Sequence, residues 1–406
     1  MTTERRCFKL NESQARERTP GKSGALRTVK AVVIVTVVLA VVILAAALLF
    51  PKLFNTDSFV RFFRYMGLKD RKNYGEISFD AGSANGYAAF GGGILVSGEG
   101  GLILYDLEGD QKAFVQAHFP SPVLAAGETV SFCFSPGSSY VSAVDESGKI
   151  CLDEALTGEV LDADVSNDGY TAYILTETGY KSVATVRNRD MNPTFRFSSR
   201  TRYLNACAVS EGGDYLALAT LGEENSVYRS SVRILRTDET LNDLDEDGSS
   251  AIQVDLGNQI IFDLDFLDRT HLCAIGQDNV TFFDVEGNIT TRVALSGQTV
   301  LDYEFSADGF MALALEQNVA GSGKRIQILD RTGELLGETT PEGALRDVSV
   351  KDEYVAVLTD RDLQICNRRL KLFYRTEELH DATGVLVRDD GTALLLSNSS
   401  AHLYIP

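Results

Sequence analysis

The chain has 406 residues, of which 44% are hydrophobic and 23% are charged. This composition excludes a disordered chain and supports a large folded core. The net charge is −19, and residues 76–406 hold 24 of the 38 basic and 52 of the 57 acidic residues. A domain this acidic lacks the clustered lysines and arginines that phosphate backbones require, so we predict no nucleic-acid partner.

The N-terminal region predicts a membrane anchor. Residues 1–30 form a basic tail, and residues 31–50, AVVIVTVVLAVVILAAALLF, contain no charge. Twenty residues in a helix span the bilayer core of about 30 Å. A cleaved signal peptide is the alternative, because Ala45 and Ala47 form a small-x-small pattern, but its apolar region is usually about 7 to 15 residues long. We predict a cytoplasmic tail, a transmembrane helix at 31–50 and a cell-membrane protein with its large domain outside the cytoplasm.

Residues 51–73 predict a juxtamembrane amphipathic linker. On a helix, Phe59, Phe62, Phe63 and Met66 group together, while basic residues point elsewhere. That pattern suits the membrane interface. A helical stalk that packs on the large domain explains it equally well, so both interpretations stay open.

The rest of the chain, 74–406, repeats one phrase. VLDADVSNDGYTAYILTE at 160–177 returns without a gap as VLDYEFSADGFMALALEQ at 300–317, and weaker copies recur with a period near 40 residues. Asp-Gly between two apolar runs favours a hairpin, because glycine adopts positive φ without steric cost. Asp168 and Asp308 are therefore predicted turn residues.

The strands of this repeat predict an all-β fold, the β-propeller. YLALAT, MALALE and YVAVLT are apolar on both faces, which a sheet between two neighbouring sheets requires. A period of about 41 residues predicts eight blades, with seven as the alternative. The C-terminal piece has three evident strands, and YGEISFD at 74–80 can supply a fourth, so that N- and C-terminal strands close the ring.

Several segments resemble one family. They are NGYAAFGGGILVSGEGGLILYDLEG at 85–109, LDADVSNDGY, GYKSVATV, LRDVSV and YVAVLTD. With the basic tail and single anchor, they look like a family of bacterial proteins of unknown function with one membrane span and an external WD40-like or quinoprotein-like propeller. The resemblance implies the fold and the location, and it brings no catalytic or ligand-binding residues.

The best metal candidate is the DLDEDG run at 243–248. Alternating carboxylates before a glycine, here Asp243, Asp245 and Asp247, are typical of a calcium loop. The twelfth position of such a loop, however, is Val254 instead of a bidentate Glu. An acidic hairpin tip in solvent explains the run as well, so calcium remains an open cofactor and no other is predicted.

No catalytic or cofactor-binding residue emerges. The chain has no tryptophan, and its four histidines have no HExxH or GxSxG companion. We therefore predict that the protein is not an enzyme. We expect it to be a protein-binding or envelope-assembly platform, whose partner is an unknown envelope or membrane protein. The alternatives are an extracytoplasmic ligand or calcium sensor, and an envelope polysaccharide hydrolase or lyase with carboxylates clustered at one channel mouth.

Overall fold

The structure is a computed structural model that describes residues 76–79, 84–237, 243–245, 251–317 and 323–406. They all belong to one compact unit, Tyr65–Pro406. The predicted tail (1–30), transmembrane helix (31–50) and linker (51–73) lie outside the described residues. In the part of the chain that is described, no helix is long and apolar enough to cross a membrane.

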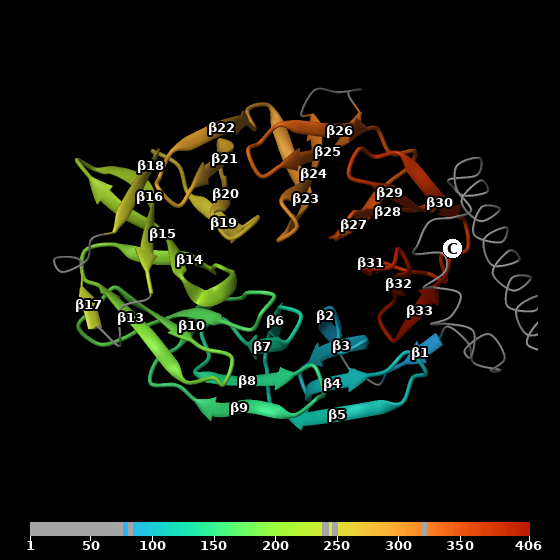
Figure 1. The fold of residues 1–406 in the computed structure, drawn as a ribbon, viewed down its shortest axis with the longest axis horizontal. Helices are drawn as coiled ribbons and strands as arrows, with labels where there is room; N and C mark the ends of the chain where they lie inside the picture. Colours follow the sequence, from blue (N-terminus) through green and yellow to red (C-terminus); the bar gives the residue numbers. More distant parts are fainter. Residues whose placement is uncertain (1–75, 80–83, 238–242, 246–250, 318–322) are drawn as a thin grey trace, which may run out of the picture. The chain divides into compact units, whose positions relative to one another are not determined.

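The described residues form eight sheets that follow one another around a ring (Figure 1). Each sheet contains four antiparallel strands in chain order, except that the last combines both ends of the domain and the third gains a fifth strand. The eight-bladed β-propeller expected from the repeats is confirmed. We number the blades 1 to 8 along the chain and call the first strand of each, which borders the central opening, the inner strand (Figure 1).

The strands of blades 1 to 4 are listed here with one short helix. Blade 1 contains β2 (Ala84–Phe90), β3 (Gly93–Gly98), β4 (Gly101–Tyr105) and β5 (Gln111–Gln116). Blade 2 contains β6 (Val123–Ala126), β7 (Val130–Phe134), β8 (Tyr140–Asp145) and β9 (Ile150–Ala155). Blade 3 contains β10 (Val160–Val165), β11 (Thr171–Leu175), β12 (Ser182–Arg187) and β13 (Pro193–Ser199). Blade 4 contains β14 (Tyr203–Val209), the 3₁₀ helix η1 (Glu211–Gly213), β15 (Tyr215–Glu224), β16 (Val227–Arg236) and β18 (Ile252–Gly257).

Blades 5 to 8 complete the ring. Blade 5 contains β19 (Ile261–Phe266), β20 (His271–Gly276), β21 (Asn279–Asp284) and β22 (Ile289–Ala294). Blade 6 contains β23 (Gln298–Ser306), β24 (Phe310–Gln317), β25 (Lys324–Asp330) and β26 (Leu335–Thr339). Blade 7 contains β27 (Leu345–Lys351), β28 (Tyr354–Thr359), β29 (Leu363–Asn367) and β30 (Leu372–Thr376). Blade 8 contains β31 (Gly384–Val387), β32 (Ala393–Leu396), β33 (Ser400–Tyr404) and β1 (Glu76–Ser78).

Both ends of the domain build blade 8. β1 pairs antiparallel with β33, and Ile77 lies opposite Ala401. Both residues are fully buried. The first described strand is therefore the outer strand of the last blade, and the pair joins the two ends of the ring.

The second strand of each blade shows why this sequence needs neighbours on both sides. Every residue of β11, β28 and β32 is buried. Adjacent blades therefore pack face to face and share their cores. Phe132 of blade 2, for example, stacks on Tyr173 of blade 3 with ring centroids 5.8 Å apart. A single blade would leave these apolar faces in water, so the ring is the stable unit.

A β-bulge recurs near the start of the inner strands. The pairing with the second strand shifts by one residue in six of the described inner strands, leaving one extra residue in each. A bulge bends its strand and re-aims the side chains beside it. The extra residues are Asn85, Leu161, Asn205, Phe262, Leu301 and Arg346.

Blade 3 carries the fifth strand. β17 (Asp243–Asp245) comes from the long connection inside blade 4 and pairs in parallel with β13. Asp243 lies opposite Arg196, and Asp245 lies opposite Ser198. This addition covers an edge strand that would otherwise be open.

Candidate functional site: the channel wall and the cleft between blades 5 and 6

Acidic side chains recur on the inner strands directly after the bulge. They occupy the first and third positions after the extra residue, where β10 and β19 carry Asp and Asp, and β23 carries Asp and Glu. β27 carries Asp and Ser at the same positions. All are partly buried except the Ser of β27, which is buried. We call seven of them the channel carboxylates: Asp162, Asp164, Asp263, Asp265, Asp302, Glu304 and Asp347.

Most of the channel carboxylates bind the main chain of the next blade. Each inner strand is an edge strand and pairs with the second strand on one side only. The N–H groups on its other side therefore have no strand partner. Carboxylates of the preceding blade accept hydrogen bonds from these amides at 2.6 to 2.9 Å. A carboxyl oxygen accepts an amide hydrogen bond whether or not the group is ionised, so these pairs tie blade 3 to 4, 6 to 7 and 7 to 8. The pairs are Asp162 with Cys207, Asp164 with Val209, Asp302 with Val348, Glu304 with Val350, and Asp347 with Val385.

The seam between blades 5 and 6 departs from this arrangement. Asp263 and Asp265 accept hydrogen bonds from their own strand, from the amides of Leu264 at 2.8 Å and Phe266 at 2.7 Å. Blade 6 donates to Asp263 through the Tyr303 hydroxyl, at 3.0 Å. Among the described residues, no main-chain amide of β23 donates to either carboxylate. The two inner strands therefore lack the amide bonds found between blades 3 and 4, 6 and 7, and 7 and 8.

A cleft of about 420 Å³ lies at this seam, on the face of the ring where the inner strands begin. Phe262 and Leu301, the extra residues of the two bulges, lie on its surface with exposures of 59% and 37%. Asp302 and Tyr303 follow Leu301 along β23 and also line the cleft. The lining residues are Phe262, Ile275, Gly276, Gln277, Leu295, Gln298, Val300, Leu301, Asp302 and Tyr303.

Burial controls the protonation of the channel carboxylates. It raises the pKa of Asp162 to about 6 and that of Glu304 to about 8, against the partial opposition of the amides of Cys207 and Val350. Burial also raises the pKa of Asp265 and Asp347, and neighbouring carboxylates add to the effect. Part of this wall therefore holds protons near neutral pH.

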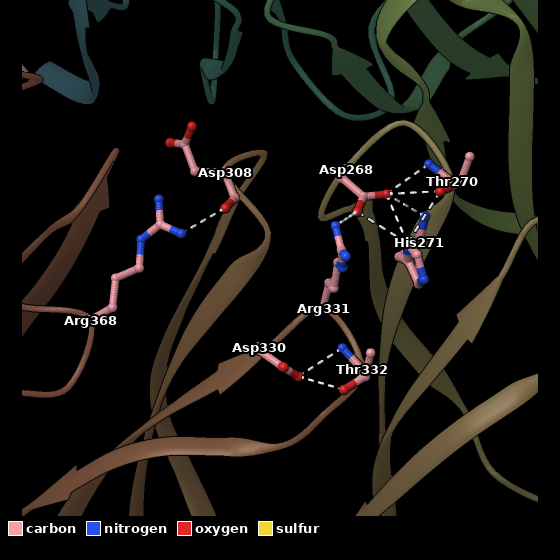
Figure 2. A network of polar contacts seen from close by, with 8 residues as sticks. All are labelled: Asp268, Thr270, His271, Asp308, Asp330, Arg331, Thr332 and Arg368. Carbon is pink, nitrogen blue, oxygen red and sulfur yellow. Dashed lines mark hydrogen bonds and ion pairs between the residues drawn. The ribbon is translucent and has the colours of Figure 1, made fainter.

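The turns at the opposite face form a second polar network (Figure 2). The Asp268 carboxylate lies between His271, whose amide donates to it at 2.8 Å, and Arg331 of blade 6, at 3.0 Å. Arg368 of blade 7 donates to the main-chain oxygen of Asp308 at 3.1 Å. Each cation contacts a turn of the preceding blade, so the network joins blades 5, 6 and 7.

The two copies of the repeated phrase make the same turn. The amide of Gly169 donates to the Ser166 carbonyl at 2.9 Å, and the amide of Gly309 donates to the Ser306 carbonyl at 3.2 Å. Both glycines have positive φ, +91° and +88°. The turn role predicted for Asp168 and Asp308 is confirmed. Their carboxylates also accept a bond from the next blade, from the amides of Gly212 at 3.0 Å and Asp352 at 2.9 Å.

The predicted metal residues do not join the channel wall. Asp243 and Asp245 belong to β17 at the outer edge of blade 3, and Asp247 lies outside the described residues. Within the described ranges, no three His, Cys, Asp or Glu side chains are arranged to hold a metal ion. Calcium binding by Asp243, Asp245 and Asp247 therefore stays a prediction.

Sequence reasoning overlooked the channel carboxylates and the cleft. A signal for the carboxylates was present, because LDADV, FDLDF and LDYEF place an acid at the same two positions of three inner strands. No comparable signal marks the cleft. It depends on how two strands with ordinary sequences approach each other.

Comparison with known proteins identifies the family. The sequence model of DUF5711, a family of unknown function, matches residues 67–400. The chain belongs to this family. None of the curated proteins matches it. The cleft and the channel carboxylates thus lie within the DUF5711 region.

Solved structures similar to this DUF5711 chain share its fold at low sequence identity. The C-terminal WD40 domain of Sif2 is 10% identical, with a TM-score of 0.52 over 77% of this chain and 92% of that chain. BamB from Moraxella catarrhalis is 15% identical, with a TM-score of 0.48 over 81% and 95% of the two chains. Hsv2 from Kluyveromyces lactis is 12% identical, with a TM-score of 0.45 over 70% and 95%. At such identities, the likeness concerns the fold alone.

Proposed function

We propose that this protein is a protein-binding platform, and that a partner docks at the cleft between blades 5 and 6. The observation that supports the proposal is the exposure of two large apolar side chains, Phe262 and Leu301, beside a concave surface. Exposed apolar surface around a pocket is typical of interaction sites. Blades 5 and 6 share a buried apolar core beneath this surface, which includes Ile275 and Met311.

The location is part of the same proposal. Residues 31–50 have the length and apolar character of a membrane span, and the preceding tail is basic. We infer a single-pass protein whose propeller lies outside the cytoplasm and whose partner is an envelope or membrane protein. Protease added to intact cells should then cut residues 76–406. If the propeller resists where a known external domain is cut, the orientation is wrong.

Site-specific crosslinking tests the docking surface. A photoreactive amino acid replaces Phe262 in the full chain, and the chain is irradiated in its native cells. The control replaces Phe114, which is 48% exposed on the outer strand β5 of blade 1. We expect one reproducible protein adduct from position 262 that is missing from position 114. Identical adducts from both positions, or no adduct from 262, would contradict the proposal.

Acid–base chemistry on envelope polysaccharides is the second candidate, because it requires carboxyl groups with raised pKa. Burial raises the pKa of Asp263 and that of Asp302, which lines the cleft. Incubation of the full chain with envelope polysaccharide should then release new reducing ends. Asp263→Asn and Asp302→Asn should abolish the release. A wild-type chain that releases none removes this candidate.

A further inference from the structure

The apolar surface of the cleft has a fixed and limited size. Phe262 and Leu301 come from the inner strands of adjacent blades, and Val300 and Leu295 are also in the lining. A side chain of the size of Leu or Phe fits a space bounded by these groups, whereas a long apolar helix would find no continuous stripe. The cleft of about 420 Å³ therefore accommodates one apolar anchor together with part of the neighbouring residues of the partner.

The cleft is lined by an acidic residue and by no basic residue among those described. Asp302 lies in the lining, and Tyr303 connects the lining to Asp263 through its hydroxyl, at 3.0 Å. No lysine, arginine or histidine is among the described residues that line the cleft. Arg325 donates to Gln298 at the margin, but it lies 3.6 Å from Glu338 and is neutralised there. A cation next to the apolar anchor therefore meets the Asp302 carboxylate, and no basic residue is among the described lining residues.

The open seam provides the necessary access. At the seams from blade 3 to 4 and from 6 to 7, main-chain amides bind the channel carboxylates. Asp302 accepts the amides of Val348 and Tyr303 on different oxygens, each at 2.9 Å, so each oxygen keeps a second lone pair for a cation. At the seam from blade 5 to 6, Asp263 and Asp265 bind only amides of their own strand and the Tyr303 hydroxyl among the described groups. No amide of β23 binds these two carboxylates among the described residues, and the carboxylate that lines the cleft at this seam is Asp302 of β23.

We propose that the cleft binds a protein segment in which one Leu or Phe side chain is flanked by Lys or Arg. The inference rests on the proposed function and adds the chemistry of the partner. The apolar side chain lies between Phe262 and Leu301, and the cation lies against Asp302. Electrostatic attraction to the acidic domain adds to the association rate.

Two matched peptides test this chemistry on the purified full chain. The probe is the peptide Gly-Ser-Gly-Arg-Phe-Arg-Gly-Ser-Gly, and the comparison replaces both Arg by Glu; binding is measured by fluorescence anisotropy. We expect the Arg peptide to bind at least tenfold more tightly. Phe262→Ser and Asp302→Asn should each weaken it at least fivefold, whereas Leu335→Ser, at a remote exposed position on β26, should leave it unchanged.

The outcomes separate this inference from the proposed function. Equal binding of the two peptides, or binding that survives both Phe262→Ser and Asp302→Asn, overturns the inferred chemistry. Failure of both peptides to bind also overturns it. In each case, a crosslinked adduct specific to position 262 in cells would still support the docking surface. The partner would then have a different sequence.

Discussion

The Lys351 ammonium lies 2.7 Å from the Glu128 carboxylate, although Lys351 ends the inner strand of blade 7 and Glu128 lies in the first turn of blade 2. Burial acts to lower the pKa of Lys351, but Glu128, Asp352 and Asp308 outweigh it and raise the pKa. The pair joins two blades that are not neighbours in the ring.

Removing this pair should have a small effect. Lys351 is about one-third exposed and Glu128 more than half exposed, so we expect Lys351→Met to lower the free energy of unfolding by less than about 1 kcal/mol. Urea unfolding of the single and double variants with Glu128→Gln would measure the coupling. A coupling well above about 2 kcal/mol would show that the pair behaves as a buried one.

The stability contributed by the hydrogen bonds between blades should depend on the presence of an acceptor oxygen and not on its negative charge. Asp162→Ala leaves the Cys207 amide without the bond it makes at 2.8 Å, and we expect a cost of about 1 to 3 kcal/mol. Asp162→Asn keeps an acceptor and removes a charge that is costly to bury. Chemical unfolding at pH 8 should therefore show Asn close to or above wild type and Ala well below it. Equal losses in both variants would refute a role for the acceptor.

Stability should fall as the pH rises from about 4 to about 8. Burial raises the folded-state pKa of Asp162 to about 6 and of Glu304 to about 8, above the unfolded values of 3.8 and 4.5. The folded state therefore binds more protons, and the stability present below pH 4 is lost as the pH rises through these folded values. Glu304→Gln should make the decrease in melting temperature shallower. A melting temperature that rises steadily to pH 8 would contradict this.

The turn carboxylates act in a lower pH range. Burial tends to raise the pKa of Asp168, but the Ser166 hydroxyl, Arg189 and the Gly212 amide outweigh it and lower the pKa. Its contribution is present above the unfolded value of 3.8 and is lost only as the pH falls through the lower folded value. Asp168→Asn should therefore leave the profile between pH 5 and pH 8 parallel to wild type, and it serves as the control for Glu304→Gln.

The two repeated turns should respond differently to the same substitution. Alanine at either Gly169 or Gly309 must adopt positive φ, which costs about 1 to 2 kcal/mol. At Gly169 the new Cβ would also lie 2.6 Å from the Thr129 hydroxyl, whereas at Gly309 the nearest atom, in Arg331, is 3.9 Å away. Thermal unfolding should show a larger loss for Gly169→Ala, by about 1 kcal/mol or more. Equal losses of stability in the two variants would mean that Thr129 of blade 2 moves away from the new Cβ without cost.

The fold could be predicted because its determinants are local and repeated. A turn such as that of Gly169 needs only neighbouring residues, and a strand such as β28 shows in its own sequence that both faces are buried. The number of blades then followed from the repeat length. These features do not depend on which blade faces which.

The candidate site could not be predicted in the same way, because it depends on distant partners. LDADV and FDLDF have acids at the same positions, yet Asp162 binds an amide of the next blade and Asp263 binds a tyrosine hydroxyl. The difference arises from how β23 lies against β19. No residue of either strand predicts that arrangement. The exposure of Phe262 likewise follows from a bulge, which appears only once the strands are paired.

The pairing of β1 with β33 has a consequence for synthesis. Glu76 lies opposite His402, so β1 has no strand to pair with until β33 has left the ribosome. Blades 1 to 7 can pack in sequence during translation, but ring closure must wait for the C-terminus and bring together the most distant parts of the domain. A nascent chain stalled before β33 would leave β1 without its partner strand, so Ile77, which is fully buried in the closed ring, would stay exposed to other chains until that strand is made.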